Sequence, residues 1–164
     1  MDNDKVLHAS QNDVHVLRFI GNIRYTLTPS IDRYLERIFT ESRPAGFVID
    51  LTETDGIDST NLGLLARLAR RMQALDSRRI TIVSNRPDIN AVLYSMALDE
   101  VFDIVEDTSL EMKAGQEVPR QNIDRETLAR TLITAHRALM DLSEHNRKIF
   151  EDVVTALENN KASD

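Results

Sequence analysis

The apolar and polar residues of the first hundred positions alternate between short strand-like runs and longer segments with helical spacing. The run VHVLRFIG at 14–21 alternates imperfectly, which suits an antiparallel or edge strand with one face in water. GFVIDL at 46–51 is apolar except for its aspartate, the pattern of a strand that helices bury on both faces. RITIVSN at 79–85 and VFDIV at 101–105 predict two further strands.

Three segments between these runs have the spacing of amphipathic helices: TPSIDRYLERIF at 28–39, STNLGLLARLARRMQAL at 59–75 and PDINAVLYSMAL at 87–98. Thr28 is a good N-cap for the first, and Pro29 suits its first helical position. In the second helix the core face carries Leu62, Leu65, Ala69 and Met72, and the other faces carry Arg67, Arg70 and Arg71. Strands that alternate with helices predict an α/β fold with a mostly parallel sheet and right-handed crossovers.

The composition changes after Val105, where glycine, proline and polar residues replace the periodic pattern. We expect one domain over 1–112 and a connector over 113–123. Residues 124–160 lack glycine and proline, so we expect a long C-terminal helix there that begins near Asp124.

Apolar residues recur every seven positions in this C-terminal segment, as in a coiled coil. One column holds Leu132, Leu139, Asn146 and Val153, and the other holds Leu128, Ala135, Leu142, Ile149 and Ala156. The apolar stripe is broader than a coiled-coil seam, because Met140, Phe150 and Leu157 widen it. Docking on its own domain, homodimerisation and binding of a partner therefore all stay open.

The overall charge argues against nucleic acid as a partner, because 27 acidic and 20 basic side chains give a net charge of −7. The absence of cysteine excludes disulfides and thiolate metal sites. The chain begins without a signal-like segment and contains no apolar run long enough for a bilayer. We expect a cytoplasmic protein with no membrane contact.

Few residues suggest catalysis or metal binding. The four histidines, His8, His15, His136 and His145, lie in the first strands or the C-terminal segment, and none is near Ser59 in sequence. No histidine pair has a carboxylate at ligand spacing, and the glycines form no phosphate-binding loop. Asp50 on a buried strand could accept a phosphoryl group, but the other residues of a phosphoaspartate receiver are not visible, so a structural ion pair is favoured. We expect no enzyme activity, metal or cofactor.

Ser59 stands where an acidic loop meets the second helix, in DGIDSTNLGLL at 55–65. Asp58 or Ser59 is expected to act as the N-cap. A hydroxyl at this position could also be phosphorylated without unfolding the domain, because the helix N-terminus favours negative charge. The added charge beside Asp55 and Asp58 would repel a partner docked on this corner.

The stretch FVIDLTETDGIDSTNLGLLARLARRM resembles the signature of STAS domains, the fold of bacterial anti-sigma factor antagonists. GNIRYTLTPSIDRYL and RITIVSNRPDINAVLYSMALDEVFDIVED resemble the flanking elements of that family, so the likeness extends over 6–112. It implies a STAS fold, an α/β fold with a mostly parallel mixed sheet and helices, to which this chain adds the long C-terminal helix.

The resemblance implies that Ser59, or less favourably Thr60, is a phosphoacceptor. The modifying partner would be an anti-sigma factor with serine kinase activity, and a serine phosphatase would restore the hydroxyl; only the unmodified chain would bind the anti-sigma factor and release the sigma factor. ATP and metal would belong to these partners.

The resemblance places the partner interface at Gly21, Asn22, Arg24, Tyr25, Asp58, Ser59, Thr60 and Asn61. Two of these depart from the family pattern: Asn61 replaces a common glycine, and Arg24 stands where an acidic residue is frequent. The C-terminal helix could bind a further regulator. The alternative is a non-switching STAS scaffold or transport-associated subunit, in which Ser59 is only a cap and the C-terminal helix binds a partner.

Overall fold

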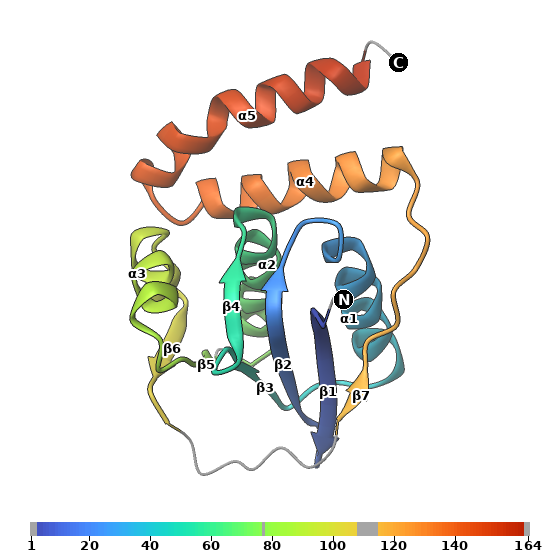
Figure 1. The fold of residues 1–164 in the computed structure, drawn as a ribbon, viewed down its shortest axis with the longest axis vertical. Coiled ribbons are helices and arrows are strands. Elements are labelled where there is room, and N and C mark those ends of the chain that lie inside the picture. The colour runs from blue at the N-terminus through green and yellow to red at the C-terminus, as the bar shows by residue number, and fades with distance from the viewer. Residues whose placement is uncertain (1–2, 77, 108–114, 163–164) are drawn as a thin grey trace.

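The computed structural model describes residues 3–76, 78–107 and 115–162, which form a mixed sheet with helices around it (Figure 1). The strands are β1 (Lys5–Gln11), β2 (Val14–Ile23), β3 (Gly46–Asp50), β4 (Thr54–Ile57), β5 (Ile80–Val83), β6 (Phe102–Val105) and β7 (Gln116–Glu117). The helices are α1 (Thr28–Glu41), α2 (Ser59–Asp76), α3 (Pro87–Ser95), the 3-10 helix η1 (Leu98–Glu100), α4 (Arg125–Met140) and α5 (Glu144–Ala162). The predicted α/β class is confirmed.

The sheet has the strand order β6-β5-β3-β2-β1-β7, and β4 also pairs with β2. The pairs among β2, β3, β5 and β6 are parallel, as predicted, whereas β1 is antiparallel to both β2 and β7. β2 is therefore an interior strand rather than an edge. Its first half pairs with β3 and its last residues pair with β4, so both strands lie along one side of β2.

The core lies between the sheet and the helices α1 and α2, which Figure 1 shows behind the strands. The predicted core face of α2 is buried: Leu62, Leu65, Ala69 and Met72. Thr28 does not cap α1, contrary to the prediction. It is the first helical residue, and its buried hydroxyl donates to Asn61 Oδ1 at 2.9 Å. The capping position belongs to Leu27, which makes no side-chain cap bond.

The C-terminal segment is helical and ends in a long helix, but it is not one continuous helix from 124 to 160. It turns back after Met140, so α4 and α5 form an antiparallel pair, called here the C-terminal hairpin (residues 125–162) (Figure 1). Asp124 caps α4 by accepting from Thr127 N at 2.7 Å, as expected of a helix start. A second cap causes the interruption, because Ser143 Oγ accepts from Asn146 N at 3.0 Å and starts α5.

The heptad columns do not form a coiled-coil seam, because they run across this turn. Asn146 is fully buried and donates to the carbonyl oxygens of Met96 at 2.8 Å and Leu139 at 2.9 Å. Val153 of the same column is exposed. The apolar side of α4 instead packs on α2, and α5 packs on α4. Docking of this segment on its own domain is the interpretation that the structure supports.

The expected domain boundary at 112 and residues 113–114 of the predicted connector lie outside the described part of the chain. The described residues of the connector run along the domain: Val118 is buried, and Val118 N donates to Val6 O at 2.8 Å. Gln121 N donates to Ser30 Oγ at 3.0 Å, so the chain is fastened to α1 shortly before α4 begins.

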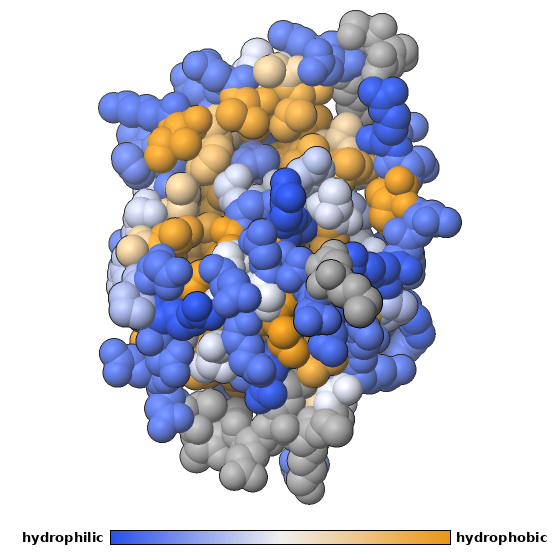
Figure 2. Space-filling view, viewed as in Figure 1, coloured by the Kyte–Doolittle hydropathy of each residue, from blue (hydrophilic) through white to orange (hydrophobic). Residues whose placement is uncertain are grey.

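Figure 2 shows apolar surface along α5, where Ile149 and Val153 remain 40% and 42% exposed. These residues are one turn apart, so they belong to one face of the helix. None of the described helices has the length and apolarity that a membrane span requires.

Candidate functional site

The predicted interface residues come from two segments that the sheet brings together at one corner, called here the Ser59 corner (residues 21–25 and 58–61). Parallel pairing of β2 with β4 aligns Asn22 with Gly56 and Ile23 with Ile57. Asp58 N then donates to Ile23 O at 3.2 Å. The end of β2 and the start of α2 are therefore neighbours, although more than thirty positions separate them.

Asp58 is the residue that fixes the geometry of this corner. Its Oδ1 accepts from Asn61 N at 3.1 Å, which makes Asp58 the N-cap of α2. Its Oδ2 accepts from Tyr25 N at 2.5 Å, so the same carboxylate holds the loop after β2. Of the two predicted capping residues, Asp58 therefore caps the helix and leaves the hydroxyl of Ser59 for another contact.

Replacing Asp58 by alanine is expected to lower the free energy of unfolding by about 1 to 2 kcal/mol, because α2 loses its cap and the loop loses an acceptor. Asp55→Ala is the matched control. It removes the same charge three residues away, where an exposed ion pair with Arg86 contributes at most about 1 kcal/mol. Urea unfolding of both variants measures the difference. Equal losses of unfolding free energy would show that the cap at Asp58 adds no stability beyond that of an exposed ion pair.

Thr60 and Asn61 are buried, so they shape the corner from below its surface. The side chain of Asn61 accepts from Thr28 Oγ1 and donates to Ile23 O at 3.3 Å and Asp58 Oδ1 at 3.0 Å. Through these bonds the amide of Asn61 ties α1, β2 and the start of α2 together. Direct contact of a partner with either side chain would require the corner to open.

The exposed part of the corner is the end of β2 and the loop that follows it. Asn22, Arg24 and Tyr25 are exposed, and Tyr25 leaves 38% of its surface in solvent. Gly21 lies in β2 with φ +87, a conformation that other residues rarely adopt, so glycine suits the irregular pairing of β2 with β4 between Gly21 and Asn22. A partner docking at the corner would meet these three side chains first.

Ser59 makes a contact that the sequence did not predict. It is half-buried, and its Oγ lies 2.9 Å from Nε2 of His136 on α4. His136 Nδ1 lies 2.7 Å from the carbonyl oxygen of Leu132. A carbonyl only accepts, so Nδ1 carries a proton and donates to it, and Nε2 is the ring atom that the Ser59 hydroxyl contacts.

The serine and histidine have the spacing of a nucleophile and its base, but the surroundings do not favour nucleophilic catalysis. His136 is oriented by a backbone carbonyl rather than by an acid. The N–H of Asn61, which could stabilise an oxyanion at this helix N-terminus, already donates to Asp58. The carboxylate of Asp58 would also repel the negative charge of such an intermediate.

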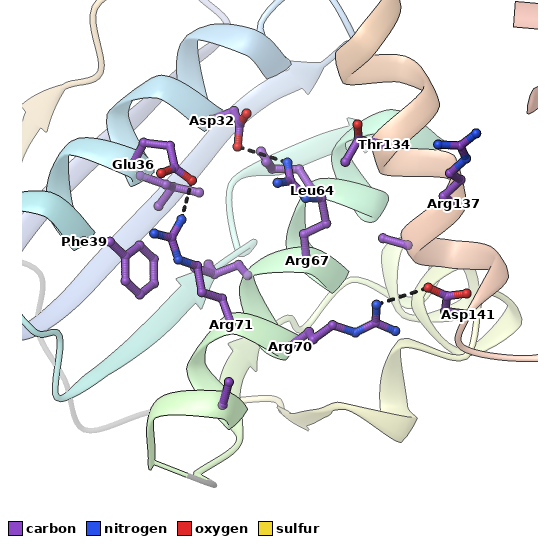
Figure 3. Close-up of a pocket in the computed structure, with 14 residues that line it drawn as sticks. Asp32, Glu36, Phe39, Leu64, Arg67, Arg70, Arg71, Thr134, Arg137 and Asp141 are labelled. Carbon is purple, nitrogen blue, oxygen red and sulfur yellow. Dashed lines mark hydrogen bonds and ion pairs between the residues drawn. The ribbon is translucent and has the colours of Figure 1, made fainter. Parts of the chain in front are cut away.

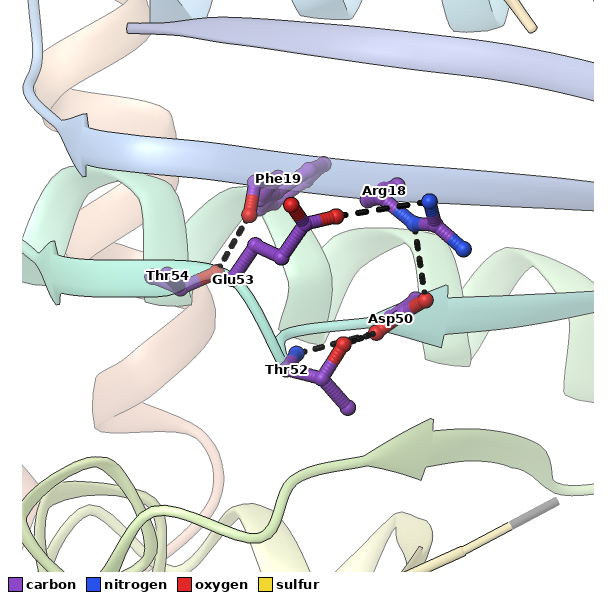
Figure 4. Close-up of polar contacts among 6 residues, drawn as sticks. All are labelled: Arg18, Phe19, Asp50, Thr52, Glu53 and Thr54. Carbon is purple, nitrogen blue, oxygen red and sulfur yellow. Dashed lines mark hydrogen bonds and ion pairs between the residues drawn. The ribbon is translucent and has the colours of Figure 1, made fainter. Parts of the chain in front are cut away.

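Asp50 is an ion-paired residue, as the sequence favoured. Its Oδ2 accepts from Arg18 Nε at 3.0 Å, and its Oδ1 accepts from the backbone and hydroxyl of Thr52 at 2.9 and 2.7 Å (Figure 4). Arg18 also contacts Glu53 Oε2 at 3.3 Å. The same view shows Thr54 donating to Phe19 O at 2.6 Å, which joins β4 to β2. Both carboxylate oxygens of Asp50 are engaged, so neither is a free phosphoryl acceptor.

A groove with a volume of about 350 Å³ lies where α1, α2 and α4 meet, and arginines line it (Figure 3). Each of the three arginines from α2 faces a carboxylate. Arg67 contacts Asp32 at 3.4 Å, Arg71 contacts Glu36, and Arg70 contacts Asp141 at 3.1 Å. The guanidinium charges are therefore already paired. Arg70 and Asp141 connect α2 to the turn of the C-terminal hairpin.

A second polar cluster lies on β1, β2 and α1. His8 contacts Tyr34 Oη at 2.6 Å and His15 Nδ1 at 2.8 Å, and the two imidazole rings are stacked. Burial and the neighbouring His15 lower the pKa of His8 to about 4, and burial also lowers the pKa of His15. Within the described ranges, no three His, Cys, Asp or Glu side chains are grouped as metal ligands would be.

These histidines predict a pH dependence of stability. Their folded-state pKa values lie below 6.5, so the unfolded chain binds more protons at pH 4 to 6.5. Their contribution is fully present above pH 6.5 and is lost as the pH falls toward about 4. For the half-exposed His8 we expect about 1 kcal/mol, below the ~3 kcal/mol of the full shift.

The variant His8→Gln should flatten this part of the stability curve, measured by urea unfolding at pH 4.5 and 7.5. The exposed His145→Gln is the control and should leave the slope as it is. A slope that is the same in His8→Gln and the unchanged chain would contradict the assignment.

Comparison with known proteins gives one family. A family model described as STAS domain matches residues 6–111. The match includes β1 to β6 and α1 to α3, and therefore the whole Ser59 corner, but it ends before α4. No curated protein matches the chain. His136 thus comes from a part of the chain that the family match does not reach.

Proposed function

The chain belongs to the STAS domain family, and from this premise we propose that it is a phosphorylation-switched anti-sigma factor antagonist. The family includes such antagonists and is associated with protein–protein interaction in general. In this proposal the chain works in the cytoplasm and has no chemistry, metal or cofactor of its own. Its unmodified form binds an anti-sigma factor that is also a serine kinase, and the sigma factor is released.

The observation that carries the proposal is the position of Ser59. Its hydroxyl is at the first residue of α2, and it is free of the capping role because Asp58 performs it. A phosphoryl group there adds charge of about −1.5 to −2 beside Asp58 without removing the cap. Docking at the exposed residues Asn22, Arg24 and Tyr25 would then face a changed electrostatic surface.

Thr60 is the weaker phosphoacceptor for a structural reason. Only 3% of its surface is exposed, so a kinase would reach its hydroxyl only after local unfolding of the helix start. Ser59, one residue earlier, is half-buried. The structural difference supports the preference for Ser59 that the family resemblance implies.

The test is transfer of phosphate from ATP. The full chain is incubated with Mg·ATP and, one at a time, the anti-sigma factor kinases of the organism that encodes it, and the intact mass is measured. We expect one phosphoryl group on the unchanged chain and on Thr60→Ser, and none on Ser59→Ala. Phosphate on Ser59→Ala, or none on the unchanged chain with any of these kinases, would contradict the proposal.

A second candidate function is supported by α5. Ile149 and Val153 expose apolar side chains on one face of this helix, which lies outside the family match. A STAS scaffold or transport-associated subunit that holds a partner permanently through α5 would use this face, and so would a homodimer. In that case Ile149→Lys would abolish partner capture or dimerisation, whereas Ser59→Glu would leave both unchanged. A phosphorylation switch predicts the reverse: Ser59→Glu would abolish partner binding, and Ile149→Lys would leave it unchanged.

A further inference from the structure

The contact between Ser59 and His136 joins the proposed phosphoacceptor to the C-terminal hairpin. His136 has only 5% of its surface exposed, and its ring lies 5.1 Å from that of Phe150 on α5. Its Nε2 faces Ser59, and its Nδ1 is held by Leu132 O. The imidazole of His136 therefore lies between Ser59 on α2 and Phe150 on α5.

The same face of α2 is covered further along by the backbone of α4. Gly63 is one turn after Ser59, so the two residues lie on the same side of the helix. A Cβ on Gly63 would lie 2.1 Å from the carbonyl oxygen of Ala135, the residue before His136. α4 thus approaches α2 at backbone distance one turn after Ser59, so the two helices are closely packed next to the hydroxyl.

A phosphoryl group on Ser59 is incompatible with this arrangement. Three oxygens and about two negative charges would be placed where the hydroxyl now contacts Nε2. His136 Nε2 lies 2.9 Å from the Ser59 oxygen and the imidazole packs on Phe150, so the ring occupies the space that a phosphoryl group directed toward α4 would need. A phosphorylated Ser59 and a docked hairpin therefore exclude each other.

We propose that the C-terminal hairpin is a cover over the Ser59 hydroxyl, held in place by the hydrogen bond between His136 and Ser59. This inference rests on the proposed function, since it concerns access to the same hydroxyl. The hairpin must swing away for Ser59 to be phosphorylated, and phosphorylation then keeps it from closing. The movement can begin after Gln121, because the chain up to that residue is held by Ser30 and Arg33.

The absence of cysteine from the chain allows a direct test with a single engineered thiol. Ser59→Cys reports access to the corner through its rate of alkylation by iodoacetamide in the full chain. Ser10→Cys is the exposed reference, and Ser84→Cys is the buried one, whose native hydroxyl is fully buried and has no hydrogen-bond partner among the described residues. Rates are taken as thiolate rate constants from pH profiles, so that a thiol pKa altered by His136 is not mistaken for access.

With the hairpin in place, the thiol of Ser59→Cys is expected to react about tenfold or more slowly than the thiol of Ser10→Cys. Adding Gly63→Ala, which pushes α4 away from α2, should raise the rate at position 59 about tenfold while the rate at position 84 stays low. A parallel rise at position 84 would mean global unfolding. His136→Ala then replaces Gly63→Ala as the loosening change, with the same expected rise at position 59.

The cover is refuted if the thiol of Ser59→Cys reacts as fast as that of Ser10→Cys in the otherwise unchanged chain. It is also refuted if neither loosening change raises the rate at position 59 while the thiol at position 84 stays protected.

No kinase takes part in this experiment, so it is independent of the phosphorylation test. A slow thiol at position 59 that loosening accelerates, in a chain that no kinase phosphorylates, would leave the cover standing and remove the proposed switch. A fast thiol at position 59 in a chain that is phosphorylated would refute the cover and leave the proposed switch standing.

Discussion

Replacing Gly63 by alanine is expected to lower the free energy of unfolding by about 2 to 3 kcal/mol, although alanine is the better helix former by about 1 kcal/mol. The added methyl group would lie 2.1 Å from Ala135 O and 2.8 Å from Ala135 Cα. These are backbone atoms, so no side-chain rotation relieves the overlap. α2 and α4 must separate, and the apolar contact between them weakens.

Gly46→Ala is the control for this prediction, because a Cβ at Gly46 meets nothing within 4 Å. It should change stability by less than about 1 kcal/mol in either direction. Urea unfolding gives both values, and hydrogen exchange should show faster exchange in α4 and α5 of Gly63→Ala. A stabilised Gly63→Ala chain would mean that the two helices are not in the close contact described above.

The variant Leu139→Ala is expected to lower the free energy of unfolding by about 2 to 5 kcal/mol, because Leu139 of α4 is fully buried in the core. Leu132→Ala, one heptad earlier on the same helix, should cost less than half as much since Leu132 is only half-buried. A coiled coil would make the two equivalent. Urea unfolding at two protein concentrations decides between the two arrangements: equal losses that depend on concentration would favour a coiled-coil dimer over the docked hairpin.

The central part of the fold was predictable because each local pattern agreed with its surroundings. The buried run at 46–51 could only be an interior strand, and the leucines of α2 repeat at helical spacing. The Ser59 corner followed from the same pattern, since a strand end and a helix start leave polar groups at the edge of the sheet. The sequence left Asp58 and Ser59 as alternative N-caps, and only the structure distinguishes them.

Two elements, β1 and α5, have local sequence signals that could have predicted them. Asn12 and Asp13 both have positive φ, and an Asn-Asp pair between apolar alternations is a hairpin turn signal that accounts for β1. Ser143 followed by Glu144 is a helix-start signal in the middle of the C-terminal segment. The unbroken heptad spacing masked it, because the same apolar positions serve two packed helices as well as one.

The contact between Ser59 and His136 could not be predicted, because it depends on how two helices 77 positions apart dock. A partial signal existed in α2. Leu64 and Leu68 lie away from the predicted core face, yet both are buried, so α2 has a second apolar side that another element must cover. Together with Gly63, this pattern could have indicated a second helix on α2, although not which one.

The measurement that tests the central claim most directly is calorimetric titration of the anti-sigma factor kinase with the full chain, unmodified and phosphorylated at Ser59. The switch predicts that phosphorylation weakens binding by about 100-fold or more, equivalent to about 2.7 kcal/mol or more. Affinities that agree within about twofold would contradict it, since the charge added at the start of α2 would then have no effect on the docking surface.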